Sequence, residues 1–341
     1  MFRLFSLPVF VSALLFGSVQ AHAEVEVLTS IKPLQLIAAA VQDGVGQPAV
    51  LLPPGASPHH YAMRPSDVRQ IRSADLFYWI GPDMESFLSP VLKGREKPSI
   101  AVQALPGMTL RHFGEAHAHD AHGDAAHAAH DNHEHDDHDH DHDHDHDHDH
   151  DHDAPAADTH EHDHDHRPGS LDAHLWLLPA NARVIAEDLA HQLAEIDPAN
   201  AERYTTNLAT FRQRLDALDE RLQARLGKVR AKPYFVFHEA YDYFEAAYGL
   251  GHAGVFSAGG EAQPGARHVA AMRERLEQAG PSCVFYEPPV RPRLADSLVR
   301  GLPAKVAELD ALGYEIAPTA QGYERLIDTL GSSLAGCLES L

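Results

Sequence analysis

Cysteine is almost absent from this sequence. The 341 residues include only Cys283 and Cys337, so there is no C-x-x-C spacing, and we do not expect the cysteines to be zinc ligands. No run of about 18 apolar residues follows the N-terminal segment, which excludes a transmembrane helix there. The P-loop, G-x-S-x-G and H-E-x-x-H motifs are also missing. Residues 249–254 match G-x-G-x-x-G, but they follow a predicted helix instead of a strand, which is the wrong context for a phosphate-binding turn.

Positive charge is missing from one long stretch. Residues 112–166 hold 20 of the 28 histidines and 19 of the 50 acidic residues, but no lysine or arginine. With no basic surface elsewhere, this charge pattern argues against nucleic acid as a partner and indicates attraction for cations. Between Glu115 and His166 the stretch also lacks aromatic and branched aliphatic residues. It cannot bury enough apolar surface to fold, so we predict a disordered loop.

The N-terminus has the pattern of a secretory signal peptide. Arg3 supplies a positive charge, residues 4–16 are largely apolar, and a small-x-small pattern ends at Ala23. We predict a signal peptide at residues 1–23, cleavage near Ala23 and an exported protein that is not inserted in the membrane. An uncleaved anchor helix is the alternative, but the apolar run is short for a bilayer.

The export signal bears on the redox state of the two cysteines. In an oxidising compartment an even pair most simply forms one disulfide, Cys283–Cys337. The bridge would close a loop of about 54 residues and stabilise the fold by roughly 3–4 kcal/mol. Two separate buried thiols are the alternative.

Short apolar runs alternate with amphipathic segments on both sides of the histidine-rich stretch. Residues 75–81 and 234–238 are typical of strands, and residues 240–248 are typical of a helix. Strands that alternate with helices predict a mainly parallel sheet covered on both faces. We therefore predict an α/β fold with two parallel-sheet lobes, at residues 24–196 (including loop 112–166) and 231–341.

A long helix is predicted between the two lobes, at residues 197–230. Apolar residues recur there at steps of three or four from Tyr204 to Leu226. A coiled-coil dimer is the alternative, but the apolar run is short, and the alternating pattern of strands and helices of the second lobe follows it directly. We expect a rigid strut within one monomeric chain.

Several histidines lie where an α/β protein binds its ligands. His59 and His60 follow a predicted strand and turn, His238 ends a second strand, and Asp310 ends a third. Ligands of open α/β sheets bind outside the carboxyl ends of strands. His174 lies in a short segment that leads into a helix. Each of these histidines alone could equally be a hydrogen-bonded structural residue, but their shared placement predicts a common site.

The chemistry of this residue set favours zinc. Three neutral imidazoles with a carboxylate or water satisfy tetrahedral Zn²⁺, whereas Mg²⁺ and Ca²⁺ prefer oxygen ligands alone. Each ligating imidazole needs an acceptor on its other nitrogen, and Asp172, Glu239 and Glu287 are candidates. Glu239 could also be the general base of a zinc hydrolase, but it neighbours His238 on a strand and should point to the opposite face.

The chain contains the stretches LLPPGASPHHYAMRPSDVRQI, DAHLWLLP, YFVFHEAYDYF and CVFYEPPVRP. These stretches, with the acidic histidine-rich loop, resemble the periplasmic zinc-uptake solute-binding proteins of ABC transporters, the ZnuA type of the cluster 9 (cluster A-I) metal-binding family. The resemblance covers nearly the whole mature chain. It implies two lobes joined by a long backbone helix, metal in the cleft between them, a membrane permease as partner and no enzymatic activity.

The resemblance also implies roles for individual residues. The metal ligands would be His59, His174 and His238, with Asp310 in the fourth position. Some zinc members have a glutamate before the first histidine, where this chain has Pro58, so water, Asp310 or His60 must fill that position. The family's disulfide matches the two cysteines. Manganese members tend to replace a histidine with a carboxylate, so three histidines favour zinc.

The histidine-rich stretch is predicted to be an accessory collector of zinc. A flexible segment must be ordered for each ion it binds, so its sites should be weak. The accessory ligands are His135, His138, His140, His142, His144, His146, His148, His150 and His152. The alternatives are a merely solubilising acidic tract and a zinc storage or buffer protein. A manganese or other divalent-metal transport protein is the alternative for the body of the chain.

Overall fold

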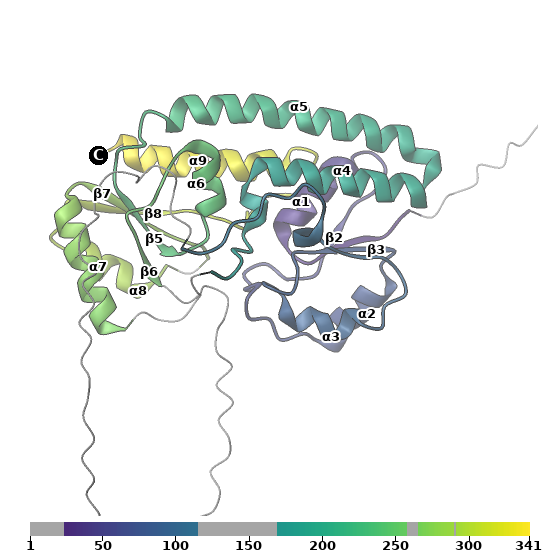
Figure 1. Ribbon diagram of the computed structural model, residues 1–341, viewed down its shortest axis with the longest axis horizontal. Helices are drawn as coiled ribbons and strands as arrows, with labels where there is room; N and C mark the ends of the chain where they lie inside the picture. Colours follow the sequence, from purple (N-terminus) through teal and green to yellow (C-terminus); the bar gives the residue numbers. More distant parts are fainter. Residues whose placement is uncertain (1–23, 115–168, 258–264, 290) are drawn as a thin grey trace, which may run out of the picture.

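The computed structural model describes residues 24–114, 169–257, 265–289 and 291–341 (Figure 1). The predicted signal peptide lies outside the described residues, and so do the accessory histidines at 135–152. Within the described ranges, none of the helices combines the length and the apolar character needed to cross a membrane.

Two four-stranded parallel sheets form the framework, as predicted. The first has the order β2-β1-β3-β4 and contains β1 (Val27–Thr29), β2 (Ala49–Val50), β3 (Leu76–Trp79) and β4 (Ser99–Ala101). The second has the order β6-β5-β7-β8 and contains β5 (Tyr234–His238), β6 (Gly254–Ser257), β7 (Ser282–Tyr286) and β8 (Ala304–Glu308). Strands β3 and β7 are buried along their whole length, because helices cover both faces of each sheet.

Helices surround each sheet. Those that follow the strands of the first sheet are α1 (Lys32–Val41), α2 (Pro65–Ser73), α3 (Ser89–Leu92) and α4 (Pro179–Ile196). Those of the second are α6 (Asp242–Tyr248), α7 (Ala266–Ala279), α8 (Arg293–Val299) and the closing helix α9 (Gly322–Glu339). Short 3₁₀ turns occur at η1 (Ser86–Leu88), η2 (Val102–Ala104), η3 (Leu175–Leu177) and η4 (Pro198–Asn200).

The long helix α5 (Ala201–Leu226) links the two halves of the chain. Its 26 residues span about 39 Å, and Figure 1 shows it running along one side of the molecule beside α4 and α9. Contacts with α1, α4 and α9 bury its apolar face, including Phe211, Leu215 and Leu222. Because this face is covered by the same chain, it is not available as the seam of a coiled-coil dimer.

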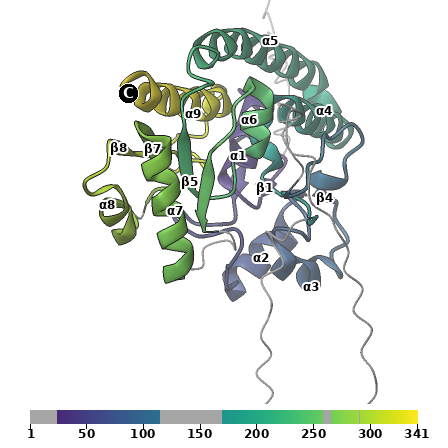
Figure 2. The same cartoon turned by 60° about the vertical axis from the view of Figure 1, so that its left-hand side comes forward.

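Helix α9 packs against both lobes. It contacts α1 of the first lobe, α5, and strands β7 and β8 of the second, and Figure 2 shows α9 beside α5. The approach of α9 to α5 is close at Gly331, where a Cβ atom would lie 2.5 Å from Leu222 Cδ2. One cluster of buried apolar side chains therefore continues from the first sheet through α5 and α9 to the second.

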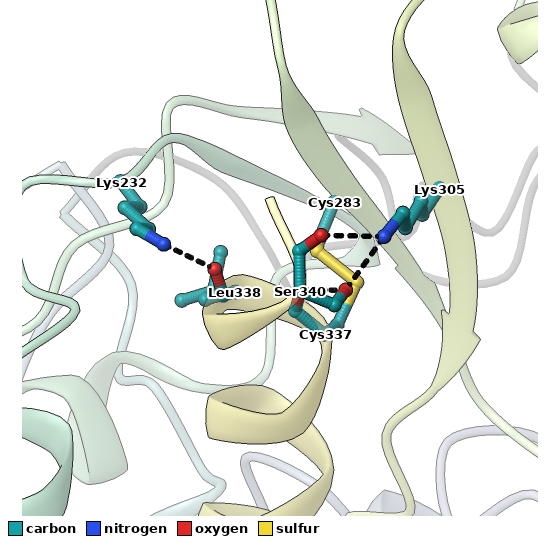
Figure 3. The surroundings of a disulfide bond; sticks show 6 residues. All are labelled: Lys232, Cys283, Lys305, Cys337, Leu338 and Ser340. Carbon is teal, nitrogen blue, oxygen red and sulfur yellow. Dashed lines mark hydrogen bonds between the residues drawn. A yellow bond between two sulfur atoms is a disulfide. The ribbon is translucent and has the colours of Figure 1, made fainter.

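A disulfide between Cys283 in β7 and Cys337 in α9 anchors this closing helix, which confirms the predicted pairing (Figure 3). Two lysines reinforce the same end of α9. The Lys232 ammonium donates to the Leu338 carbonyl at 2.7 Å, and Lys305 donates to the Ser340 carbonyl at 2.6 Å. Cations at a helix C-terminus satisfy its last carbonyls and interact favourably with its dipole.

Glu85, between β3 and η1, is a buried carboxyl that makes folding stability depend on pH. Burial raises the pKa of Glu85 from 4.5 to about 7, although the Ile80 N–H, which donates to Glu85 Oε2 at 2.7 Å, opposes the shift. The unfolded chain releases this proton near pH 4.5, whereas the folded chain keeps it up to about pH 7, so stability falls across that window as pH rises.

Glu85→Gln is expected to remove this loss, which amounts to about 3 kcal/mol. Urea unfolding from pH 4 to 8 measures it, and a difference between the two proteins that does not change with pH would contradict the account.

Candidate metal centre

Three histidines from separate parts of the chain approach one another. His59 lies in the loop after β2, His174 caps the start of η3, and His238 is the last residue of β5. Each is set by a different segment: a turn beyond a strand end, a 3₁₀ turn that leads into α4, and a strand buried in the second sheet. Their convergence therefore requires the two lobes to be in place together.

The geometry of the triad suits a single ion. Ring centroids are 5.4 Å apart for His59–His174, 5.4 Å for His59–His238 and 4.9 Å for His174–His238. One ring nitrogen from each residue lies within 4.8 Å of the others. His174 is only 2% exposed and His59 only 9%, while His238 is partly buried. These distances allow a small movement of the rings to bring three nitrogens onto one metal ion.

Two carboxylates contact the rings of His174 and His238 and orient them. His174 Nδ1 lies 2.7 Å from Asp172 Oδ1, which also accepts the His174 backbone N–H at 3.0 Å. His238 Nδ1 lies 3.1 Å from Oε2 of Glu287, the residue that directly follows β7. Such carboxylate–histidine pairs fix the orientation of a ligating imidazole. Asp172 and Glu287, two of the three acceptors predicted from the sequence, therefore each contact Nδ1 of one of these histidines.

The electrostatic environment favours a cation. Burial raises the pKa of Asp172 well above its usual value, and the nearby carboxylates of Asp242 and Glu239 raise it further. Burial also opposes ionisation of Glu287, yet the neighbouring His238 and the hydrogen bonds with His238 and Tyr241 lower the pKa of this carboxyl. Several acidic groups thus surround the three imidazoles, and a bound cation would offset the cost of burying them.

Asp310 and His60, the two other predicted ligands, lie outside the group of ligand atoms that the three histidines form. Asp310 Oδ1 accepts the backbone N–H groups of Leu312 and Gly313, and its Oδ2 accepts that of Tyr314. Burial raises the pKa of Asp310 despite these bonds. His60 is exposed, and its ring centroid is 6.4 Å from that of His59. Neither belongs to the group of ligand atoms within 4.8 Å of one another, and the fourth position remains a prediction.

Two supporting residues were missed by sequence reasoning. The Tyr241 hydroxyl donates to the Leu309 carbonyl at 2.5 Å and to Glu287 Oε1 at 3.0 Å. Trp176 donates its indole N–H to the Ala311 carbonyl at 2.9 Å, which ties the segment after His174 to the Asp310 loop. The sequence signal was present in the DAHLWLLP and YFVFHEAYDYF stretches, but periodicity alone assigns those aromatic residues to the core.

Comparison with known proteins identifies relatives that take part in zinc uptake. The profile of the family described as "Zinc-uptake complex component A periplasmic" matches residues 27–337. The "High-affinity zinc uptake system protein ZnuA" of Yersinia pestis is 37% identical over 330 residues, covering 96% of both chains. The protein of the same description from Brucella abortus (strain 2308) is 41% identical over 324 residues, covering 94% of both.

Solved structures share the fold. The solute-binding protein FpvC of Pseudomonas aeruginosa in complex with Mn²⁺ has a TM-score of 0.69 at 19% identity, covering 93% of this chain and 99% of that one. A 138–173 deletion mutant of ZnuA with zinc bound has a TM-score of 0.65 at 20% identity, covering 92% and 98%. At these identities the structures support the architecture only. The family profile and the sequence relatives decide the assignment: this chain belongs to the ZnuA family of periplasmic zinc-uptake components.

Proposed function

We propose that this protein captures Zn²⁺ in the periplasm with His59, His174 and His238 and delivers it to the membrane permease of an ABC transporter. The observation that carries the proposal is the convergence of three imidazoles from separate segments to within 4.8 Å. The curated relatives, described as high-affinity zinc uptake proteins, support the identity of the cargo.

The donor set favours zinc over manganese. Imidazole is a borderline ligand that Zn²⁺ binds at about 2.0–2.1 Å, whereas Mn²⁺ prefers carboxylates and water. Because Nδ1 of His174 and of His238 faces a carboxylate, Nε2 is the ligand atom of both rings. Water, Asp310 or His60 completes the tetrahedron. A site that a water completes can exchange its fourth ligand, which suits a protein that must release its cargo.

Asp172→Asn is expected to weaken tight zinc binding by about 10- to 100-fold. The amide keeps the size of the carboxylate but removes the charge that holds the Nδ1 proton of His174, and its NH₂ group favours the wrong tautomer. Competition with a chelator measures the affinity. Asp216→Asn, at a 69% exposed side chain on α5, is the matched control. An Asp172→Asn affinity within about twofold of that of the unsubstituted protein would show that this carboxylate does not support the ligand.

The histidine-rich stretch is assigned the role of a weak accessory collector. Tethering holds weakly bound ions near the triad at a raised local concentration. Its two ends are tied together in the fold, because the Gly169 N–H donates to the Phe113 carbonyl at 2.8 Å and His112 bridges to Leu171. Residues 117–166 can therefore be replaced by a short glycine-serine link without separating these partners.

This deletion separates transport from storage. Calorimetry on the shortened chain is expected to show one tight zinc retained and the weaker sites lost. If tight binding disappears as well, the histidine-rich stretch is the main site and the protein is a zinc store. If the weaker sites persist unchanged, the stretch collects no metal and serves solubility alone.

A further inference from the structure

Asn181 links two backbone segments that lie on either side of Asp172 and His174. It lies in the first turn of α4 and is fully buried. Its Oδ1 accepts the Thr109 N–H at 2.8 Å, and its Nδ2 donates to the Thr109 carbonyl at 2.9 Å and to the Leu175 carbonyl at 3.0 Å. Side chains of a helix tilt toward its N-terminus, which is why Asn181 reaches residues that precede α4. One side chain therefore holds two segments that are far apart in the sequence.

The first of these segments, residues 109–111, supports Asp172. The Arg111 carbonyl accepts the Asp172 backbone N–H at 2.9 Å. Tyr243 on α6 fixes the same segment from the second lobe, because its hydroxyl oxygen accepts the Arg111 N–H at 2.8 Å. Residues 109–111 are thus held by α4 at one end and by α6 at the other, and their position sets that of the Asp172 backbone.

The second segment begins at Leu175, the residue that directly follows His174. The hydrogen bond from Asn181 to the Leu175 carbonyl fixes the start of η3, which also packs against α6. Asp172 and His174 lie between the two fixed points, and both are buried, at 0% and 2% exposure. In a close-packed interior neither side chain can readjust freely, so a backbone shift on either side changes how the carboxylate meets the ring.

We propose that Asn181 is a positioning residue of the zinc site, a role that rests on the proposed capture of Zn²⁺ by His59, His174 and His238. Asn181 does not bind the ion. It keeps Asp172 and His174 fixed relative to each other, so that the ring presents Nε2 at one position and angle. A binding site must hold its ligands to within about 0.5 Å. Loss of this link should therefore weaken zinc binding without removing any ligand.

Asn181→Asp is the variant closest in shape to the native side chain. It keeps Oδ1 but replaces the Nδ2 donor with an oxygen that faces the carbonyls of Thr109 and Leu175. We expect the folded variant to bind zinc about 10-fold more weakly in a chelator competition. Its visible absorption with bound Co²⁺ should also differ from that of the unsubstituted protein, because this spectrum depends on the geometry of the ligands.

Asn207 on α5 offers a matched control. It is 9% exposed, and its Nδ2 donates to the Val41 carbonyl at 2.8 Å and to the Asp43 carbonyl at 2.9 Å. Asn207→Asp therefore also places an oxygen against two backbone carbonyls, but neither of them belongs to residues 109–111 or to η3. This control should lower the melting temperature and leave the zinc affinity and the Co²⁺ spectrum unchanged.

Two results would overturn the role of Asn181. Asn181→Asp could bind zinc as tightly as the unsubstituted protein, or both asparagine variants could lose the same affinity, and either result leaves Asn181 with an effect on stability alone. If Asn181→Asp does not fold, Asn181→Ala removes all three hydrogen bonds without adding an acidic group and carries the same expectations. The unsubstituted protein is measured in the same series. Weak zinc binding by that protein contradicts the zinc capture itself, whereas tight binding matched by the variants contradicts only the role of Asn181.

Discussion

Replacing His174 with alanine is expected to weaken tight zinc binding by about 1000-fold. Structural zinc sites contribute about 10–16 kcal/mol in total, so one of three protein ligands accounts for about 4 kcal/mol. His174 is the most deeply buried of the three imidazoles, at 2% exposure, and Asp172 holds its ring in place.

Chelator competition measures the loss, with circular dichroism and a melting curve to confirm that the variant is folded. His191→Ala is the control, because this side chain is 68% exposed on α4 and is not one of the three converging histidines. Substitution of His59 or His238 should have effects of similar size. If His174→Ala keeps its tight zinc site, the three-histidine account is wrong and the ion is held elsewhere.

Removing the disulfide with Cys283→Ala and Cys337→Ala is expected to lower the free energy of unfolding by about 4 kcal/mol. The bridge spans 54 residues, and closing a loop of that length restricts the unfolded chain by about this amount in the chain-entropy model. It also joins β7 to the helix that packs on both lobes. The loss should therefore appear as lower stability of the whole protein.

Urea unfolding at neutral pH measures this change. Reduction of the unsubstituted protein should reproduce the same loss, which separates the effect of the bond from that of the substituted side chains. The zinc affinity of the folded variant should change little, because neither cysteine contacts the triad. A loss below about 1 kcal/mol would mean that the packing of α9 alone holds the closing helix, against the loop-entropy argument.

Much of the architecture could be predicted because its signals are local. Alternating strands and helices predict two parallel sheets, and the recurrence from Tyr204 to Leu226 predicts the long helix. The boundaries of individual strands were harder to predict. The segment around residues 99–105 looks like one strand, but only Ser99–Ala101 pairs with β3 before the chain turns into η2. Pairing depends on the neighbouring strand, which sequence periodicity does not specify.

The candidate site was predictable to a similar degree. His238 follows from the rule that ligands gather at the carboxyl ends of parallel strands. The surroundings of Asp310 could not be foreseen, because its carboxylate accepts backbone N–H groups only in the turn that residues 312–314 adopt.

The most direct test of the central claim is a crystal structure of the full-length protein with one equivalent of zinc. The account predicts a single ion about 2.0–2.1 Å from Nε2 of His174, Nε2 of His238 and one ring nitrogen of His59. An ion held by residues 112–166, or three imidazoles too far apart to share one atom, would contradict it.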